Sequence, residues 1–73
     1  MSEDLEAVYE RFMHHACLSD ALEDANVETV TAVKARLQPV LGDGWQAHDG
    51  SPFSMQTNAQ RKALLGLIQE SKL

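Results

Sequence analysis

The sequence predicts an all-α protein, a small bundle of three to four short helices with a long glycine-rich loop before the last one. Apolar residues recur at intervals of three and four in four separate segments, which is the period of an amphipathic helix. Between the third and fourth segments, residues 42–56 hold three of the four glycines and show no such period. At 73 residues, the chain is expected to form a single helical domain, 1–73.

The first segment is expected to be a helix over about residues 3–17, with Ser2 as a plausible N-cap. Its apolar stripe comprises Leu5, Val8, Tyr9, Phe12 and Ala16. The next stripe, Leu18, Ala21, Leu22 and Ala25, lies on a different face, because each residue advances a helix by roughly 100°. We therefore expect the chain to bend near Ser19, which would cap a second helix over 19–25. The alternative is one long helix that contacts two surfaces.

Asn26 is expected to cap the third helix, whose inward residues would be Val27, Val30, Val33, Leu37 and Leu41. The β-branched residues here also suit a strand, but the spacing of three and four favours a helix. Because Pro39 lacks a backbone donor and disfavours helical angles at Gln38, the regular helix should end or kink near that point.

Thr57 and Gln60 form a capping-box pattern that predicts the start of the last helix, which should run to about Ser71. Its inward residues are expected to be Ala63, Leu64, Leu67 and Ile68. Gly66 either permits a close helix crossing or weakens the helix. Leu65 lies outside the inward stripe, so it is either a scattered exposed leucine or part of an apolar contact patch.

The loop over residues 42–56 contains the only Trp, Trp45, and one of the two Phe, Phe53. Two Asp-Gly pairs, which favour tight turns, predict a small hairpin or a compact Ω-type loop. The two rings either fold over the core as lids or face a partner, since aromatic residues dominate binding hot spots. The sequence leaves both interpretations open.

The net charge of −5 is unevenly distributed, because residues 1–30 carry eight acidic residues against one basic residue, Arg11. The rest of the chain is mildly basic. This polarity suits attachment of the chain to itself, to a second copy or to a basic partner. The lack of a dense basic surface argues against duplex DNA as the main target. Four acidic residues are expected to form a continuous acidic edge that is solvated, imitates nucleic-acid phosphates or docks a basic protein groove: Asp20, Glu23, Asp24 and Glu28.

The chain shows no catalytic or cofactor signature, so we expect neither an enzyme nor a bound cofactor. The residues with metal-ligand chemistry are His14, His15, Cys17, His48 and Asp49. A structural zinc site usually has paired Cys or His ligands in both halves, and this set has one thiol. Exposed helix histidines beside a buried thiol are the expected outcome.

We therefore expect a small cytoplasmic interaction protein, a regulator or inhibitor that binds a protein partner or forms a homodimer. The small core and the absence of an internal disulfide favour association. The expected contact residues are Leu65 and Trp45, with Phe53, Arg61 and the acidic edge in support. The alternatives are a helix-turn-helix nucleic-acid module, formed by the second and third segments, and a small metal-binding protein. No stretch is apolar enough to suggest a membrane span.

Overall fold

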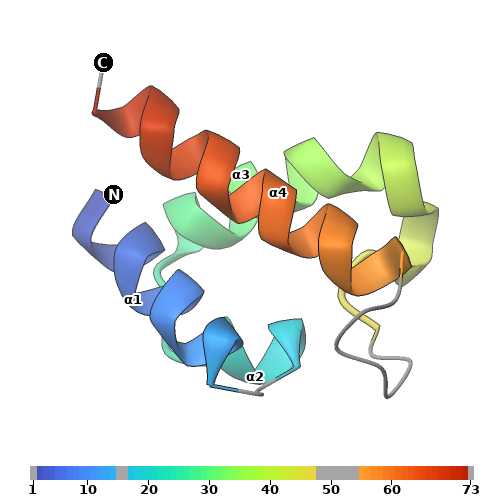
Figure 1. Cartoon of the computed structure of the whole chain (residues 1–73), viewed down its shortest axis with the longest axis horizontal. Coiled ribbons are helices and arrows are strands. Elements are labelled where there is room, and N and C mark those ends of the chain that lie inside the picture. The colour runs from blue at the N-terminus through green and yellow to red at the C-terminus, as the bar shows by residue number, and fades with distance from the viewer. Residues whose placement is uncertain (1, 15–16, 48–54, 73) are drawn as a thin grey trace.

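The computed structural model describes residues 2–14, 17–47 and 55–72, which form four α-helices and one short 3-10 helix and contain no strand (Figure 1). The predicted all-α class is confirmed. The helices are α1 (Ser2–Met13), α2 (Leu18–Ala21), α3 (Val27–Leu41), η1 (Gly42–Gly44) and α4 (Met55–Ser71). The first Asp-Gly pair of the loop forms η1, and the second pair lies outside the described residues.

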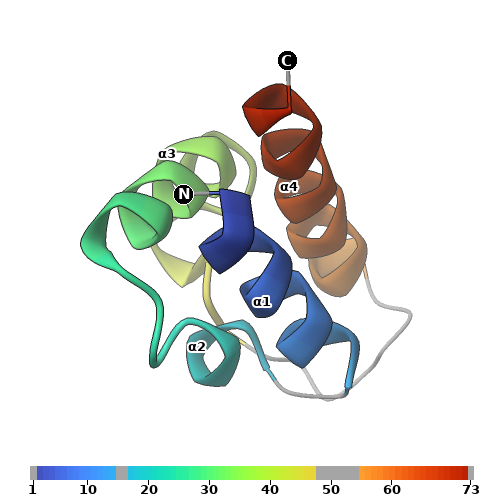
Figure 2. The ribbon, with the colours of Figure 1, turned by 90° about the vertical axis from the view of Figure 1, so that its left-hand side faces the viewer.

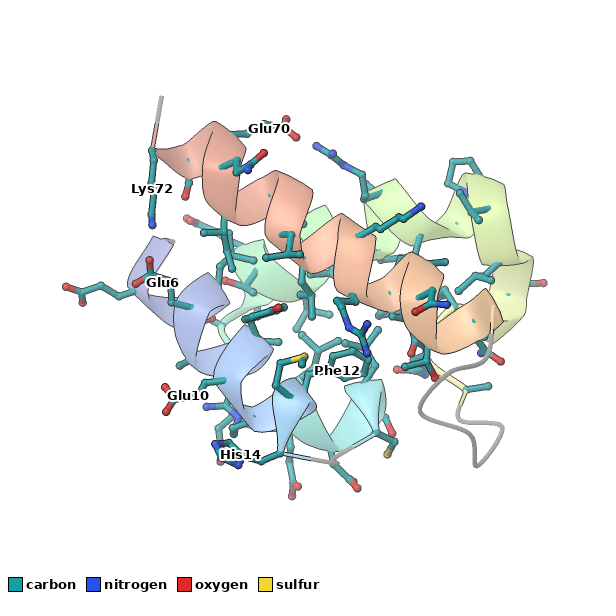
Figure 3. All side chains as sticks on the ribbon, in the orientation of Figure 1. Glu6, Glu10, Phe12, His14, Glu70 and Lys72 are labelled. Carbon is teal, nitrogen blue, oxygen red and sulfur yellow. The ribbon has the colours of Figure 1, made fainter. Side chains whose placement is uncertain are left out.

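The longest helix, α4, packs on both α3 and α1, and α2 packs on α1. Figure 2 shows α1 and α3 beside α4, with α2 at one end. An exposed ion pair of 3.2 Å between Lys72 and Glu6 joins the end of α4 to α1, and Figure 3 shows both side chains. The buried apolar side chains form one cluster, to which every α-helix contributes: Leu5, Val8, Phe12, Leu18, Ala21, Leu22, Val33, Leu37, Trp45, Ala63, Leu64, Leu67 and Ile68.

The predicted break between the first two helices is present, but it lies earlier than expected. The first helix ends at Met13 rather than near residue 17, and extended Cys17, not Ser19, is the N-cap of α2. The second helix is also shorter than predicted and ends at Ala21. The Arg11 side chain stabilises this short helix, because its Nε and Nη2 donate to the Ala21 carbonyl at 3.0 and 2.7 Å. A carbonyl at a helix end thereby gains the partner that the helix itself cannot supply.

The predicted N-cap of α3 is confirmed, since Asn26 Oδ1 accepts a hydrogen bond of 2.9 Å from the Thr29 backbone N–H. The expectation that Val27 faces the core is wrong. Thr29 is fully buried, and residues two apart on a helix point roughly 200° apart, so Val27 is 80% exposed. The fully inward line of α3 is Thr29, Val33 and Leu37, and Val30 and Leu41 are half-buried beside it.

The carboxylate of Asp4 joins α1 to the start of α3, because its Oδ2 accepts a hydrogen bond of 3.0 Å from the Asn26 backbone N–H. The buried Thr29 hydroxyl makes no hydrogen bond of ordinary geometry among the described residues. It nevertheless lies close to the Asp4 carboxylate, and the dipole of its O–H acts on that carboxylate. The Thr29 hydroxyl first, and then the Asn26 N–H, hold the pKa of Asp4 below its ordinary value.

The sequence predicted that the third helix ends or kinks near Gln38. The helix does not end there but continues through Pro39 to Leu41. A proline this close to the end disturbs only the last turn. Gly42 terminates the helix at φ 64°, and its N–H donates to the Gln38 carbonyl. Glycine adopts this left-handed conformation without the steric cost that a side chain would bring.

Two glutamines of α4 hold the start of the loop against this helix. Gln60 Nε2 donates to the carbonyls of Trp45 and Ala47 at 3.0 and 3.1 Å. One turn earlier, Gln56 Nε2 donates to the carbonyls of Gly44 and Ala47 at 3.0 and 2.7 Å. The capping-box prediction placed the start of this helix two residues late, since it begins at residue 55. The Gln60 side chain binds the loop instead.

Candidate functional site

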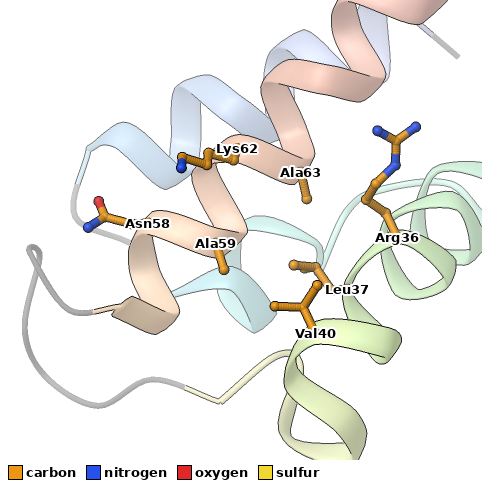
Figure 4. A pocket seen from close by; sticks show the side chains of 7 residues that line it. All are labelled: Arg36, Leu37, Val40, Asn58, Ala59, Lys62 and Ala63. Carbon is orange, nitrogen blue, oxygen red and sulfur yellow. The ribbon is translucent and has the colours of Figure 1, made fainter.

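An open groove of about 740 Å³ runs between the second half of α3 and the first half of α4 (Figure 4). Its volume lies in the range of sites that hold ligands. The lining residues are Arg36, Leu37 and Val40 of α3 and Asn58, Ala59, Lys62 and Ala63 of α4. On each helix, pairs of these residues are four apart, so they lie one above the other on the same face.

The floor of the groove is apolar. In Figure 4, Ala59 and Ala63 point from α4 toward Leu37 and Val40 of α3. The methyl side chains of these alanines are too short to fill the space between the helices, which therefore remains open. Leu37 is 1% exposed and belongs to the core, whereas Val40 is 67% exposed. The groove thus offers an aliphatic surface that the chain itself does not cover within the described residues.

The rim of the groove is cationic. Arg36 lies at the α3 edge of the groove. Its Nη2 forms an ion pair with Oε2 of Glu70, which lies on α4. The guanidinium passes over Gly66, where an added Cβ would lie 3.0 Å from Arg36 Nη1. Gly66 therefore makes room for a side chain rather than for a close crossing of helix backbones. Lys62, at the α4 edge, is exposed and forms no ion pair within the described part of the chain.

The groove is suited to binding rather than to bond-making chemistry. Among the described residues, its lining includes no carboxylate, imidazole, thiol or hydroxyl group. The polar groups that it presents are one guanidinium, one ammonium and the Asn58 amide. Such groups recognise and orient a ligand of opposite charge, and a general acid or base for use near neutral pH is not among them.

The contact residues predicted from the loop and the last helix occupy different places. Trp45 is 7% exposed and belongs to the core, as the lid interpretation expected. Leu65 is 40% exposed outside the inward stripe and lies one turn after Lys62, but it does not line the groove. Arg61 is half-buried, with its Nη1 at 3.5 Å from the Asn58 Oδ1. Phe53 lies outside the described residues.

The four residues of the predicted acidic edge, Asp20, Glu23, Asp24 and Glu28, are all exposed. They lie on α2, on the turn after it and in the first turn of α3. No ion pair is formed by any of them among the described residues. The acidic edge and the groove lie toward opposite ends of α3. None of the four acidic residues therefore lines the groove.

The possible metal ligands are only partly described. No group of three or more His, Cys, Asp or Glu side chains able to hold a metal ion occurs among the described residues. His14 is exposed, and the half-buried Cys17 thiol lies 3.2 Å from the Ser19 hydroxyl. His15, His48 and Asp49 lie outside the described part of the chain.

Sequence reasoning did not single out Arg36, Val40 and Lys62 as a common surface. The available signal was the four-residue spacing of Arg36 and Val40, together with Lys62 on the polar side of the last helix. Because Pro39 was expected to end or kink the helix near Gln38, helical spacing alone did not place Arg36 and Val40 on one face. Once α3 is extended to its true end, Val40 falls on the same face as Arg36.

No protein-family model matches the chain, and no curated protein or solved structure is significantly similar to it. Among the described helices, none has the length and apolar character that a membrane crossing requires. The groove between α3 and α4 is therefore the feature that bears most directly on function.

Proposed function

We propose that the protein is a small non-enzymatic interaction protein, a regulator or inhibitor that acts by holding a protein partner in the α3–α4 groove. The observation that carries this proposal is Val40, an aliphatic side chain of the apolar floor that is 67% exposed between two cationic rim residues. An apolar centre with a polar rim is the usual anatomy of a protein–protein contact. Covering Val40 would contribute about 1–2 kcal/mol to binding.

A second exposed apolar residue, on α4, supports association. Leu65 is exposed next to the rim residue Lys62, so a partner that extends beyond the α4 edge would cover it. A second copy of the chain is the alternative occupant of either surface, since a core this small gains stability from association. The exposed valine and leucine therefore define two positions at which contact is tested.

Site-specific crosslinking tests the proposal directly. A photoreactive amino acid is placed singly at Val40, at Leu65 or at Val27, and the three proteins are irradiated in extracts of the native host. Val27 is the matched control, because it is an exposed valine at the opposite end of α3, 80% exposed against 67% for Val40. We expect position 40 to capture one defined protein, position 65 to capture the same protein more weakly, and position 27 to capture none.

Equal labelling from all three positions would contradict the proposed site. A crosslink from position 65 alone would move the contact to the outer face of α4. A covalent dimer formed by the purified protein would identify the second copy as the occupant. Absence of any specific product at all three positions would count against a protein-interaction function on these faces.

A further inference from the structure

The charge of the groove differs from that of the rest of the molecule. The chain has a net charge of −5, yet the part of the groove lining that the structure describes contains Arg36 and Lys62 and no acidic residue. Surfaces that bind specifically usually meet complementary electrostatic potentials. An occupant with carboxylates beside its apolar residues would satisfy this rim, whereas a basic occupant would be repelled by it.

The chain's own Glu70 shows how such a carboxylate is bound. Glu70 forms its ion pair with Arg36 from the helix opposite, and both side chains are exposed, at 57% and 39%. An exposed pair of this kind is weak and exchanges readily with solvent. A carboxylate from an occupant can therefore replace Glu70 at Arg36, while Lys62 binds a second carboxylate without displacing any partner among the described residues.

The shape of the groove favours a helix as the occupant. The space is open and bounded by two helices, whereas sites for small molecules bury most of the ligand surface. Laying the apolar face of an amphipathic helix into such a groove is a common mode of peptide recognition. Two cationic side chains are too few for a nucleic-acid backbone, which requires a dense basic surface.

We infer that the groove binds an amphipathic helix of another protein whose apolar residues, three or four apart, are flanked by Asp or Glu. This inference rests on the proposed function and specifies its partner. The apolar residues cover Val40 and the alanines of the floor, and the carboxylates bind Lys62 and Arg36. Glu70 is an internal competitor for the occupant, because it pairs with Arg36 in the free protein.

A random peptide library displayed on phage provides the probe. The wild type is used for selection, and Val40→Glu is used for counter-selection, because a carboxylate on the floor repels an acidic peptide and opposes apolar contact. The 67% exposure of Val40 implies that this variant keeps its fold, which circular dichroism checks. We expect enriched peptides with a net negative charge and aliphatic residues three or four apart.

The affinity of the best enriched peptide is then measured for four further variants. These measurements distinguish the effect of the charged rim residues from the effect of the protein's overall charge. Lys62→Gln should weaken binding about two- to fivefold, whereas Lys34→Gln, which removes the same charge from an exposed lysine outside the groove, should not. Glu70→Gln should strengthen binding about two- to fivefold by freeing Arg36, whereas Glu10→Gln on α1 should not.

Three outcomes would overturn the inference: enriched peptides that are neutral or basic, equal affinities within each matched pair, or no enrichment that depends on Val40. If crosslinking from position 40 still captures a host protein in these cases, the interaction function stands and only the partner chemistry is wrong. A covalent dimer from position 40 would instead make the second copy the occupant.

Discussion

Trp45 shows how a single residue of the glycine-rich loop becomes part of the core. The 3-10 turn of η1 precedes it, its own carbonyl accepts from Gln60, and its ring is 7% exposed. We expect Trp45→Ala to lower the free energy of unfolding by about 3–5 kcal/mol, because a large buried ring leaves a cavity. Urea denaturation followed by circular dichroism measures the change. Leu65→Ala, at an exposed position, is the control and should cost about 0.5 kcal/mol or less.

Gly66 lies inside α4 beneath the Arg36 guanidinium. Alanine here should stabilise the helix by about 0.5–1 kcal/mol, because glycine is a poor helix former. The new Cβ would press on the end of a flexible side chain and loosen an exposed ion pair worth less than about 1 kcal/mol. We therefore expect Gly66→Ala to raise the melting temperature by a few degrees, roughly 2–6 °C. A lower melting temperature would show that Arg36 cannot move aside.

Hydrogen bonds from Gln60 and Gln56 attach the start of the loop to α4. Gln60 is 2% exposed, so its loss leaves the Trp45 carbonyl without its bond in a buried environment. Gln60→Ala should cost about 1–3 kcal/mol, whereas Gln56→Ala, at a more exposed position, should cost about 0.5–1.5 kcal/mol. Chemical denaturation monitored by the fluorescence of Trp45 measures both. Equal losses would contradict the buried role of Gln60.

The hydrogen bond from the Asn26 N–H to the Asp4 carboxylate, which joins α1 to α3, makes the free energy of unfolding depend on pH in the acid range. The pKa of Asp4 is lower in the folded state than in the unfolded state. The contribution of Asp4 to the free energy of unfolding is therefore complete above the ordinary aspartate pKa of about 3.9, and it is lost as the pH falls through the pKa of the folded state. Asp4→Asn should therefore reduce the urea midpoint near neutral pH and lessen its fall below about pH 4. The exposed turn residue Asp24 supplies the control, Asp24→Asn, which should leave this acid dependence unchanged.

Sequence periodicity was sufficient to predict the four helical segments, and it failed where tertiary contacts set their boundaries. The Asn26 cap is a local signal and was predicted correctly. The burial of Thr29 depends on α1, since its neighbour across the interface is Asp4, and a polar residue gave no reason to expect it. Gln60 matched a local capping motif, but its donors are used by a loop fifteen residues away in sequence.

The candidate site was harder to predict than the fold, because it exists only between two helices. Nothing in the local sequence of α3 shows that Ala59 and Ala63 will lie opposite Val40. The same limit applied to Trp45, whose burial depends on how the loop returns to α4. Charge polarity along the chain was visible in the sequence, but it pointed to the acidic edge rather than to the groove.

The chain places acidic residues near the start of α3 and a cationic groove near its end. Helix geometry puts Glu28 and Val40 about 18 Å apart along the helix axis. Under the proposed function, the opposite charges at the two ends of α3 would orient a partner that binds the groove. The acidic edge would repel the carboxylates of such a partner and hold them to the groove end.

A partner that binds only the folded chain must also stabilise it. At a concentration 100-fold above its dissociation constant, an acidic amphipathic peptide should add about 2.7 kcal/mol, which raises the melting temperature by roughly 10–20 °C for a domain of this size. In the absence of peptide, we expect the melting temperature not to depend on protein concentration, because the proposed occupant of the groove is another protein and not a second copy. Thermal unfolding across a wide concentration range, with light scattering for molecular mass, tests both statements. A melting temperature that rises with protein concentration, and no longer does so in Val40→Glu, would instead show that a second copy fills the groove.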